Sequence, residues 1–197
     1  MNTGVVWFRN ALRLNDNRVL VECLNSANSR TILPLYILNK SDLEQNNNEN
    51  RIKFLYESLI DLNANFKAKF GSNLIVLNGK SEEVFRKLLG SDLLDISEIF
   101  TDYSNKPNDI KNENNLKSVL AKHTSVKLHL ISKVNSLTDI EEVVNQENFK
   151  PPKTMKDMEK LFSNLYPKDE DGFYSIDEPL DTPENSKPTS ENFSEII

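Results

Sequence analysis

The chain has 197 residues, of which 38% are hydrophobic and 27% are charged, values that suit one α/β domain with a core of its own. No apolar run approaches the ~18 residues of a membrane helix, and the N-terminus lacks a basic segment followed by a cleavage site. One cysteine and two histidines exclude an internal disulfide and argue against a structural zinc site. These features predict a protein of the cytoplasm, the nucleus or both, with no membrane partner.

The formal net charge of −6 is concentrated at the C-terminal end. From Lys168 to Ile197 the chain carries nine acidic residues against two lysines, and half of its eight prolines lie at or beyond Pro167. So few apolar side chains cannot offset the loss of conformational entropy on folding. We therefore expect residues 166–197 to be an acidic, disordered tail or the start of a linker, after a folded domain at residues 1–165. The nearly neutral domain shows no strong nucleic-acid footprint.

The first elements in chain order are two strands with a helix between them. Residues 5–8 and 31–38 are apolar runs too short for helices, and they suit strands buried on both faces. Pro34 indicates a bulge or an edge-like position in the second strand. Residues 19–24 have helical spacing, and Asp16 is the expected N-cap.

The next elements are a long helix, a strand and a shorter helix. Apolar residues recur every three or four positions over 52–70, and Gly71 is well placed to end this helix. Residues 73–77 are the third predicted strand. Ser81 is the expected N-cap of a helix whose apolar positions lie within 84–89.

The rest of the chain continues the alternation of strands and helices, and the pattern becomes weaker after residue 131. Strands are predicted at 98–103 and 126–131, with a helix around 116–120 between them and short helices at 139–146 and 154–164. Repeated strand–helix order is typical of a parallel sheet with helices on both faces, and crossovers are right-handed. The predicted fold is therefore α/β, a Rossmann-like, doubly wound, five-stranded parallel sheet.

Ligands of such sheets lie beyond the carboxyl ends of the strands. No G-x-G-x-x-G, Walker or G-x-S-x-G motif follows any predicted strand, so the sequence does not support a dinucleotide-dependent dehydrogenase or a hydrolase. A small nucleotide-binding domain of the same topology stays open as a weaker hypothesis. We predict no catalytic residue and no metal ligand. The candidate binding residues at the strand ends are Arg9, Asn10, Asn39, Lys40, Asp102, Tyr103 and Ser104.

Several runs of the sequence resemble motifs of the photolyase/cryptochrome family. Residues 7–17 (WFRNALRLNDN) resemble the opening motif W-F-R-x-x-L-R-x-x-D-N of that family. Four later runs resemble, in order, its P-V-F-I strand, its N-R-x-R-F-L-x-x-S-L helix, its L-x-G-x-x-x-x-V-F segment and its K-P-P-L-T ending. These runs are residues 34–37, 50–59, 77–85 and 150–154.

The resemblance covers roughly residues 3–165. Within the family, the sequence resembles animal cryptochromes and (6-4) photolyases most, because Ala11 is small where bacterial enzymes tend to carry aspartate. The family's E-P-x-x-x-E-R-D becomes residues 106–113, in which the leading acid is Lys106 and the arginine is lost. Its H-T-L-[YW]-D becomes residues 135–139, and Met155 replaces the tyrosine that follows K-P-P-L-T. These departures indicate relaxed demands on a vestigial antenna pocket at the strand-end residues.

The resemblance implies a relation to blue-light receptors, including those of circadian signalling, and to light-driven DNA repair enzymes. In that family FAD is held in a helical domain after the α/β domain, and some members add a pterin or deazaflavin antenna. No such helical domain follows residue 165, and Trp7 is the single tryptophan. Deoxyribodipyrimidine or (6-4) photolyase activity therefore lacks its electron donor on this chain.

Two hypotheses follow from the resemblance. In the first, the chain binds no cofactor and is a non-catalytic binding or regulatory remnant of the family, truncated before the flavin domain, with a protein as its partner. In the alternative, it is the antenna-domain part of a functional photoreceptor or photolyase that a flavin domain elsewhere completes. The departures from the family motifs favour the first hypothesis.

Overall fold

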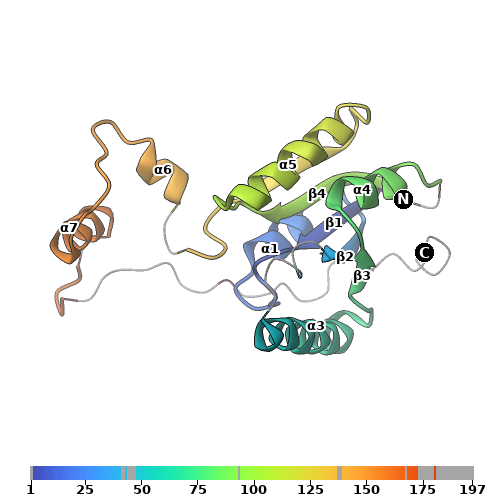
Figure 1. The fold of residues 1–197 in the computed structure, drawn as a ribbon, viewed down its shortest axis with the longest axis horizontal. Helices are drawn as coiled ribbons and strands as arrows, with labels where there is room; N and C mark the ends of the chain where they lie inside the picture. Colours follow the sequence, from blue (N-terminus) through green and yellow to red (C-terminus); the bar gives the residue numbers. More distant parts are fainter. Residues whose placement is uncertain are drawn as a thin grey trace. The chain divides into compact units, whose positions relative to one another are not determined.

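The computed structural model describes residues 2–40, 43, 48–92, 94–136, 139–166, 168–172 and 180, which are drawn in colour in Figure 1. The chain divides into two compact units, residues 1–135 together with 180–197, and residues 136–179. Most of the predicted acidic tail lies outside the described residues. Of the helices in the described part, none has the length and apolarity that a membrane span requires.

The first unit is built on five parallel strands. Their spatial order is β3-β2-β1-β4-β5, so β1 is central and the strand order reverses between β1 and β4. Ligands of doubly wound sheets bind at such a reversal point. This topology confirms the predicted Rossmann-like sheet. The strands are β1 (Asn2–Phe8), β2 (Thr31–Leu38), β3 (Ile75–Asn78), β4 (Asp95–Asp102) and β5 (Lys127–Ile131).

Helices cover both faces of this sheet. The helices α1 (Arg18–Asn25) and α3 (Glu49–Phe70) pack on one face of the sheet, and α4 (Ser81–Leu89) and α5 (Pro107–Leu120) pack on the other face (Figure 1). Gly71 ends α3 with φ 69°, a left-handed conformation that glycine adopts without a Cβ penalty. The expected end of the long helix is thus confirmed.

The core has two layers because side chains alternate along β1. Phe8 faces α3, and its ring lies 6.5 Å from that of Phe66, edge to face. Trp7 faces the opposite side, where its ring lies 5.2 Å from Phe85 of α4. All four aromatic side chains are buried, and for Trp7 and Phe8 the apolar run at residues 5–8 predicted this. The central strand is therefore packed on both faces, and its carboxyl end is held in place from above and below.

Pro34 occupies an edge-like position of β2. It pairs with Val6 of β1 in regular register, whereas the ladder between β2 and β3 begins only at Leu35. The N–H that proline lacks therefore falls where β2 has a single neighbour. Of the two alternatives expected from the sequence, the edge-like position is confirmed.

Two predicted helix caps are wrong. The N-cap of α1 is Asn17, whose Oδ1 accepts from the Leu20 amide at 3.3 Å, and not Asp16. Ser81 is the first residue of α4, and Lys80 occupies the N-cap without a side-chain hydrogen bond. Aspartate, asparagine and serine all cap well, so residue type alone does not separate neighbouring positions.

The second unit contains α6 (Ile140–Val144) and α7 (Met155–Leu165). A capping box starts α7: the Asp157 amide donates to Thr154 Oγ1 at 3.2 Å, and the Thr154 amide donates to Asp157 Oδ2 at 3.0 Å. Hydrogen bonding of the Asp157 carboxylate with the Thr154 side chain, and with the Lys153 and Thr154 amides, holds the pKa of Asp157 below its usual range. None of the side chains of α7 is buried.

A buried carboxylate ties β4 to the loop between α1 and β2 and to the edge strand β5. Glu98 is 3% exposed, and its Oε2 accepts from the hydroxyls of Ser26 and Ser29, the latter at 2.9 Å. Its Oε1 accepts from Asn28 Nδ2 at 3.3 Å and lies 3.0 Å from His129 Nε2. Burial raises the pKa of Glu98, but the hydrogen bonds from these four side chains lower it, and the net direction is downward.

The lowered pKa of Glu98 makes folding sensitive to acid. A folded-state pKa below the unfolded value contributes stability above the unfolded pKa, and this contribution is lost as the pH falls through the folded pKa. We predict that Glu98→Gln destabilises the fold by about 1–3 kcal/mol near neutral pH and reduces the further loss of stability toward about pH 3. Urea unfolding across this pH range measures both effects, with the exposed Glu57→Gln as control. An unchanged acid-dependent loss in Glu98→Gln contradicts the prediction.

Candidate functional site

A cleft of about 740 Å³ opens beyond the carboxyl ends of β1 and β2. The ends of both strands, the first turns of α3 and α5 and the first residue of α4 form its walls. It therefore lies beside the strand-order reversal, where the fold directs ligands. Its polar lining side chains include Arg9, Asn10, Asn39, Arg51, Lys106 and Asp109.

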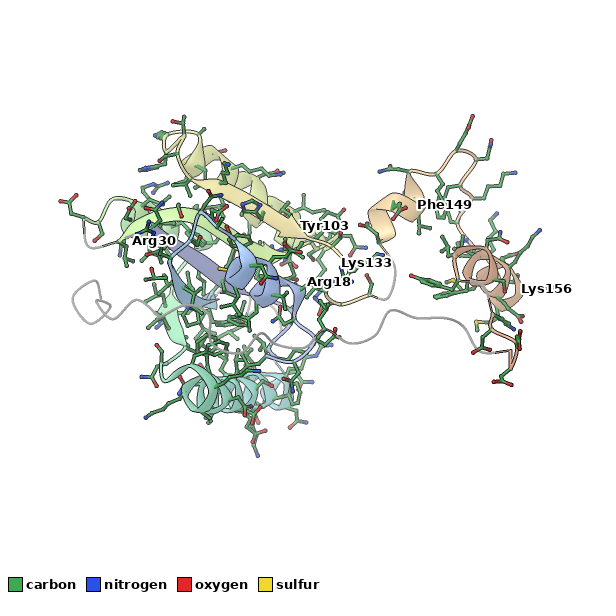
Figure 2. All side chains as sticks on the ribbon, turned by 180° about the vertical axis from the view of Figure 1, so that it is seen from behind. Arg18, Arg30, Tyr103, Lys133, Phe149 and Lys156 are labelled. Atoms are coloured by element: carbon green, nitrogen blue, oxygen red, sulfur yellow. The ribbon has the colours of Figure 1, made fainter. Side chains whose placement is uncertain are left out.

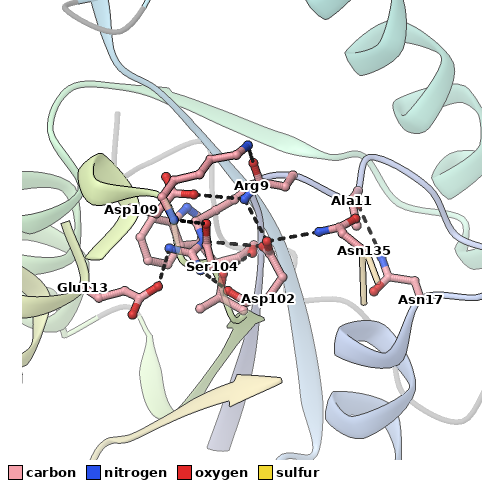
Figure 3. Close-up of polar contacts among 12 residues, drawn as sticks. Arg9, Ala11, Asn17, Asp102, Ser104, Asp109, Glu113 and Asn135 are labelled. Carbon is pink, nitrogen blue, oxygen red and sulfur yellow. Dashed lines mark hydrogen bonds and ion pairs between the residues drawn. The ribbon is translucent and has the colours of Figure 1, made fainter. Parts of the chain in front are cut away.

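The floor of the cleft is a buried ion-pair network around Arg9. The Arg9 side chain is 9% exposed, with Nε 3.4 Å from Asp102 Oδ1 and Nη1 donating to Glu113 Oε1 at 2.9 Å. Nη2 donates to the carbonyl oxygen of Asp102, as Figure 3 shows. The guanidinium also lies 5.0 Å from the centre of the Trp7 ring. All three guanidinium nitrogens have acceptors within the protein, so Arg9 orders the floor of the cleft.

Asn10 connects the same network to the start of α5. Its Nδ2 donates to Asp102 Oδ2 at 2.8 Å and lies 3.2 Å from Asp109 Oδ2, while its Oδ1 accepts from Lys106 Nζ at 2.7 Å. Asn135 Nδ2 donates to Asp102 Oδ2 at 3.4 Å (Figure 3). These bonds hold the ends of β1 and β4 and the start of α5 in one arrangement.

The other strand-end candidates are divided between the cleft and its support. Asn39 lines the cleft, whereas Lys40 is exposed and does not line it. Tyr103, labelled in Figure 2, follows β4, and its amide donates to a β5 carbonyl at 2.8 Å. Ser104 is buried, and its hydroxyl accepts from the Lys106 amide at 3.3 Å. The structure thus brings Arg9, Asn10 and Asn39 to the cleft and places Asp102 beneath it.

Arg13, the second arginine of the run at residues 7–17, makes its polar contacts within the protein. Its Nη2 lies 3.6 Å from Asp16 Oδ2 and donates to the carbonyl oxygen of Val134 at 2.7 Å. Asp16 itself has φ 50°, and its amide donates to the carbonyl of Leu180 at 3.1 Å. The arginine therefore fixes the turn before α1 and lies outside the cleft lining.

Sequence reasoning missed four residues of the site: Glu113, Arg51, Lys106 and Asp109. Glu113 stands at the last acidic position of the family motif that residues 106–113 resemble, so this acid is retained where the other charges are lost. Arg51 belongs to the run at 50–59 that resembles another family motif. Both residues therefore lie in runs that resemble family motifs, but a motif does not show which side chains pair. Arg9 and Glu113 are 104 residues apart in the chain, so their ion pair could not be predicted.

The comparisons with known proteins agree with this fold. Residues 4–180 match the DNA photolyase family, and the chain belongs to this family. It is 32% identical over 165 residues to Cryptochrome-1 of Spalax judaei, which covers 83% of this chain and 27% of that relative. It is also 41% identical over 100 residues to the blue-light photoreceptor PHR2 of Arabidopsis thaliana, covering 45% of this chain and 21% of PHR2. The chain spans about a quarter of the length of these curated relatives.

Two solved structures share the fold. The cryptochrome of Synechocystis superposes with a TM-score of 0.76 at 22% identity, over 97% of this chain and 38% of that chain. The archaeal photolyase of Sulfolobus tokodaii superposes with a TM-score of 0.69 at 21% identity, over 97% of this chain and 39% of that chain. The latter is described with two FAD molecules and with the implication of a novel light-harvesting cofactor.

The Arg9 network makes the stability of the domain sensitive to Glu113. We predict that Glu113→Gln lowers the free energy of unfolding by about 3 kcal/mol, the lower end for a broken buried pair, because Asp102 still holds Arg9. Glu57→Gln is the matched control, since its carboxylate lies 3.8 Å from Lys53 Nζ on an exposed helix face and contributes ~0.5 kcal/mol or less. Urea unfolding near neutral pH measures both variants, and equal effects contradict the prediction.

Proposed function

We propose that this chain is a non-catalytic, ligand-binding domain of the photolyase/cryptochrome type, acting in the cytoplasm or the nucleus, and that the cleft is its binding site. The observation that carries the proposal is the ordered floor, where Arg9, Asp102 and Glu113 hold one another beneath a cleft of about 740 Å³. This volume lies within the range of small-molecule sites, about 300–1,000 Å³. A site whose floor is already fixed loses little entropy on binding.

The walls of the cleft favour a flat ring compound. Tyr36, Ile52 and Leu55 contribute apolar surface, while Asn39 and Arg51 add hydrogen-bonding groups. Pterins, deazaflavins and flavins combine an apolar ring face with polar edges, and they are the ligand class we propose. This departs from the expectation of a chain without a cofactor, because the cleft retains the volume and the ordered floor that such a ligand needs.

Trp7 provides the test, because it is the single tryptophan of the chain and lines the cleft. We predict saturable quenching of its fluorescence when the purified protein is titrated with riboflavin, a pterin or a deazaflavin. Asn39→Phe fills part of the cleft and is expected to abolish the quenching, whereas Asn114→Phe, on an exposed position of α5 outside the cleft, leaves it intact. Absence of saturable quenching with every compound overturns the proposal.

A second candidate function is association with a helical flavin domain carried by another polypeptide. Apolar residues recur along α7 at Met155, Met158, Phe162 and Leu165, a spacing that places them on one face. Met155 is 84% exposed and Met158 is 39% exposed. An apolar helix face of this kind suits a protein partner. The Synechocystis cryptochrome, which covers 97% of this chain with only 38% of its own, shows how much larger a related protein is.

Purification of the tagged chain from its native source tests this association. We expect a flavoprotein, recognised by the visible absorbance of its flavin, to co-purify with the unaltered chain and to be lost on Met155→Glu combined with Met158→Glu. Lys156→Glu, a charge change on a neighbouring position of α7 labelled in Figure 2, is the matched control and retains the partner. A flavin-free chain from the native source contradicts the second candidate.

A further inference from the structure

The second unit begins directly after a fixed part of the first unit, the segment that follows β5. Val134 belongs to the first unit, is 5% exposed and packs in the core layer that contains Phe8. Its carbonyl oxygen accepts from Arg13 Nη2 at 2.7 Å. The next residue, Asn135, donates from Nδ2 to Asp102 Oδ2 at 3.4 Å. Apolar packing and two polar contacts therefore fix the point at which the chain leaves the first unit.

The chain rejoins the first unit at Leu180, which contacts the same turn before α1. The Asp16 amide donates to the carbonyl oxygen of Leu180 at 3.1 Å, and the Leu180 amide donates to Asp16 Oδ1 at 3.2 Å. Asp16 has φ 50°, a left-handed conformation that aspartate adopts more readily than most residues. One residue of the turn thus binds both backbone groups of Leu180.

Arg13 and Asp16 join these two points. Arg13 Nη2 lies 3.6 Å from Asp16 Oδ2, and Arg13 Nε and Nη2 donate to the Asp16 carbonyl oxygen at 3.3 and 3.0 Å. Each polar group of Asp16 therefore contacts either Arg13 or Leu180. Val134 and Leu180 are far apart in the chain, but the two residues that hold them are an i,i+3 pair of one turn.

The point of return is held less firmly than the point of exit. The side chains of Arg13 and Asp16 are 41% and 53% exposed, and an ion pair so exposed contributes little to stability. Leu180 is half-buried, whereas Val134 is buried. The contacts of Leu180 must also offset the entropy lost when the long segment before it is closed into a loop. These contacts therefore open locally, without unfolding of the sheet.

We propose that Arg13 and Asp16 form a latch, which closes residues 136–179 into a loop and opens at Leu180 while Val134 stays fixed. With the latch closed, both ends of the segment that carries α6 and α7 are held at the turn before α1. With the latch open, the segment is an arm held at one end, which changes the effective concentration of α7 near a partner. The latch lies outside the cleft lining and requires no ligand there.

Hydrogen exchange of the Leu180 amide, followed by NMR on the full chain, tests the latch. We expect this amide to exchange about tenfold more slowly in the unaltered chain than in Asp16→Ala, which removes its acceptor. Arg13→Gln is also expected to speed the exchange, although Arg13 does not contact Leu180, because it positions Asp16. Asp61→Ala is the matched control: it removes an exposed carboxylate of α3 that accepts from Asn65, and leaves the exchange unchanged.

Each element of the proposal has a result that overturns it. Equal exchange of Leu180 in the unaltered chain and in Asp16→Ala means that no latch exists. Slow exchange that survives Arg13→Gln shows that the two residues do not act as a pair. The Tyr103 amide, which donates to the end of β5 at 2.8 Å, reports on the exit, and its faster exchange in Asp16→Ala contradicts a fixed exit.

A salt titration of the unaltered chain repeats the test without any substitution. Because salt screens exposed charges, we expect Leu180 to exchange several-fold faster at about 1 M than at about 0.1 M salt. The amide of Val6, at the centre of β1, is expected to keep its rate and shows that the fold is intact in each variant and at each salt concentration. A Leu180 rate that does not respond to salt contradicts a latch held by the Arg13–Asp16 pair.

Discussion

The buried guanidinium of Arg9 is the constraint on which the rest of the site depends. A charge that is 9% exposed must be matched inside the protein, and Asp102 and Glu113 provide the match from β4 and α5. The three side chains come from segments that are far apart in the chain, so their pairing joins the carboxyl ends of two strands to the middle of α5. The floor of the cleft is rigid for this reason.

The fold and the charge pattern of the cleft depend on different parts of the molecule. The two-layered core around β1 produces the parallel sheet that the DNA photolyase family shares, and the strand-order reversal places the cleft. At the rim of the cleft, Lys106 stands where the family motif that residues 106–113 resemble has an acid. A domain can keep its core and its floor while the rim changes its charge, because the rim contributes little to packing.

The sequence was sufficient for the sheet and its helices because apolar periodicity reports burial directly. The runs at 5–8 and 31–38 became central strands, and the stripe at 52–70 became α3. The sequence could not decide whether Asp16 or Asn17 is the N-cap of α1, since both residue types cap helices well. It also gave no hint of the Glu98 cluster, or of the partner of Arg9, because such contacts join residues that the chain separates widely.

The most direct test of the account is the rate at which the Arg9 Nε–H exchanges with water, measured by NMR on nitrogen-labelled protein. If Asp102 and Glu113 hold Arg9 beneath the cleft, its Nε–H exchanges about tenfold more slowly, or slower still, than that of Arg86, which is exposed on α4. If Arg9 and Arg86 exchange at the same rate, the guanidinium is open to solvent. The ordered floor, and the binding site built on it, then do not exist.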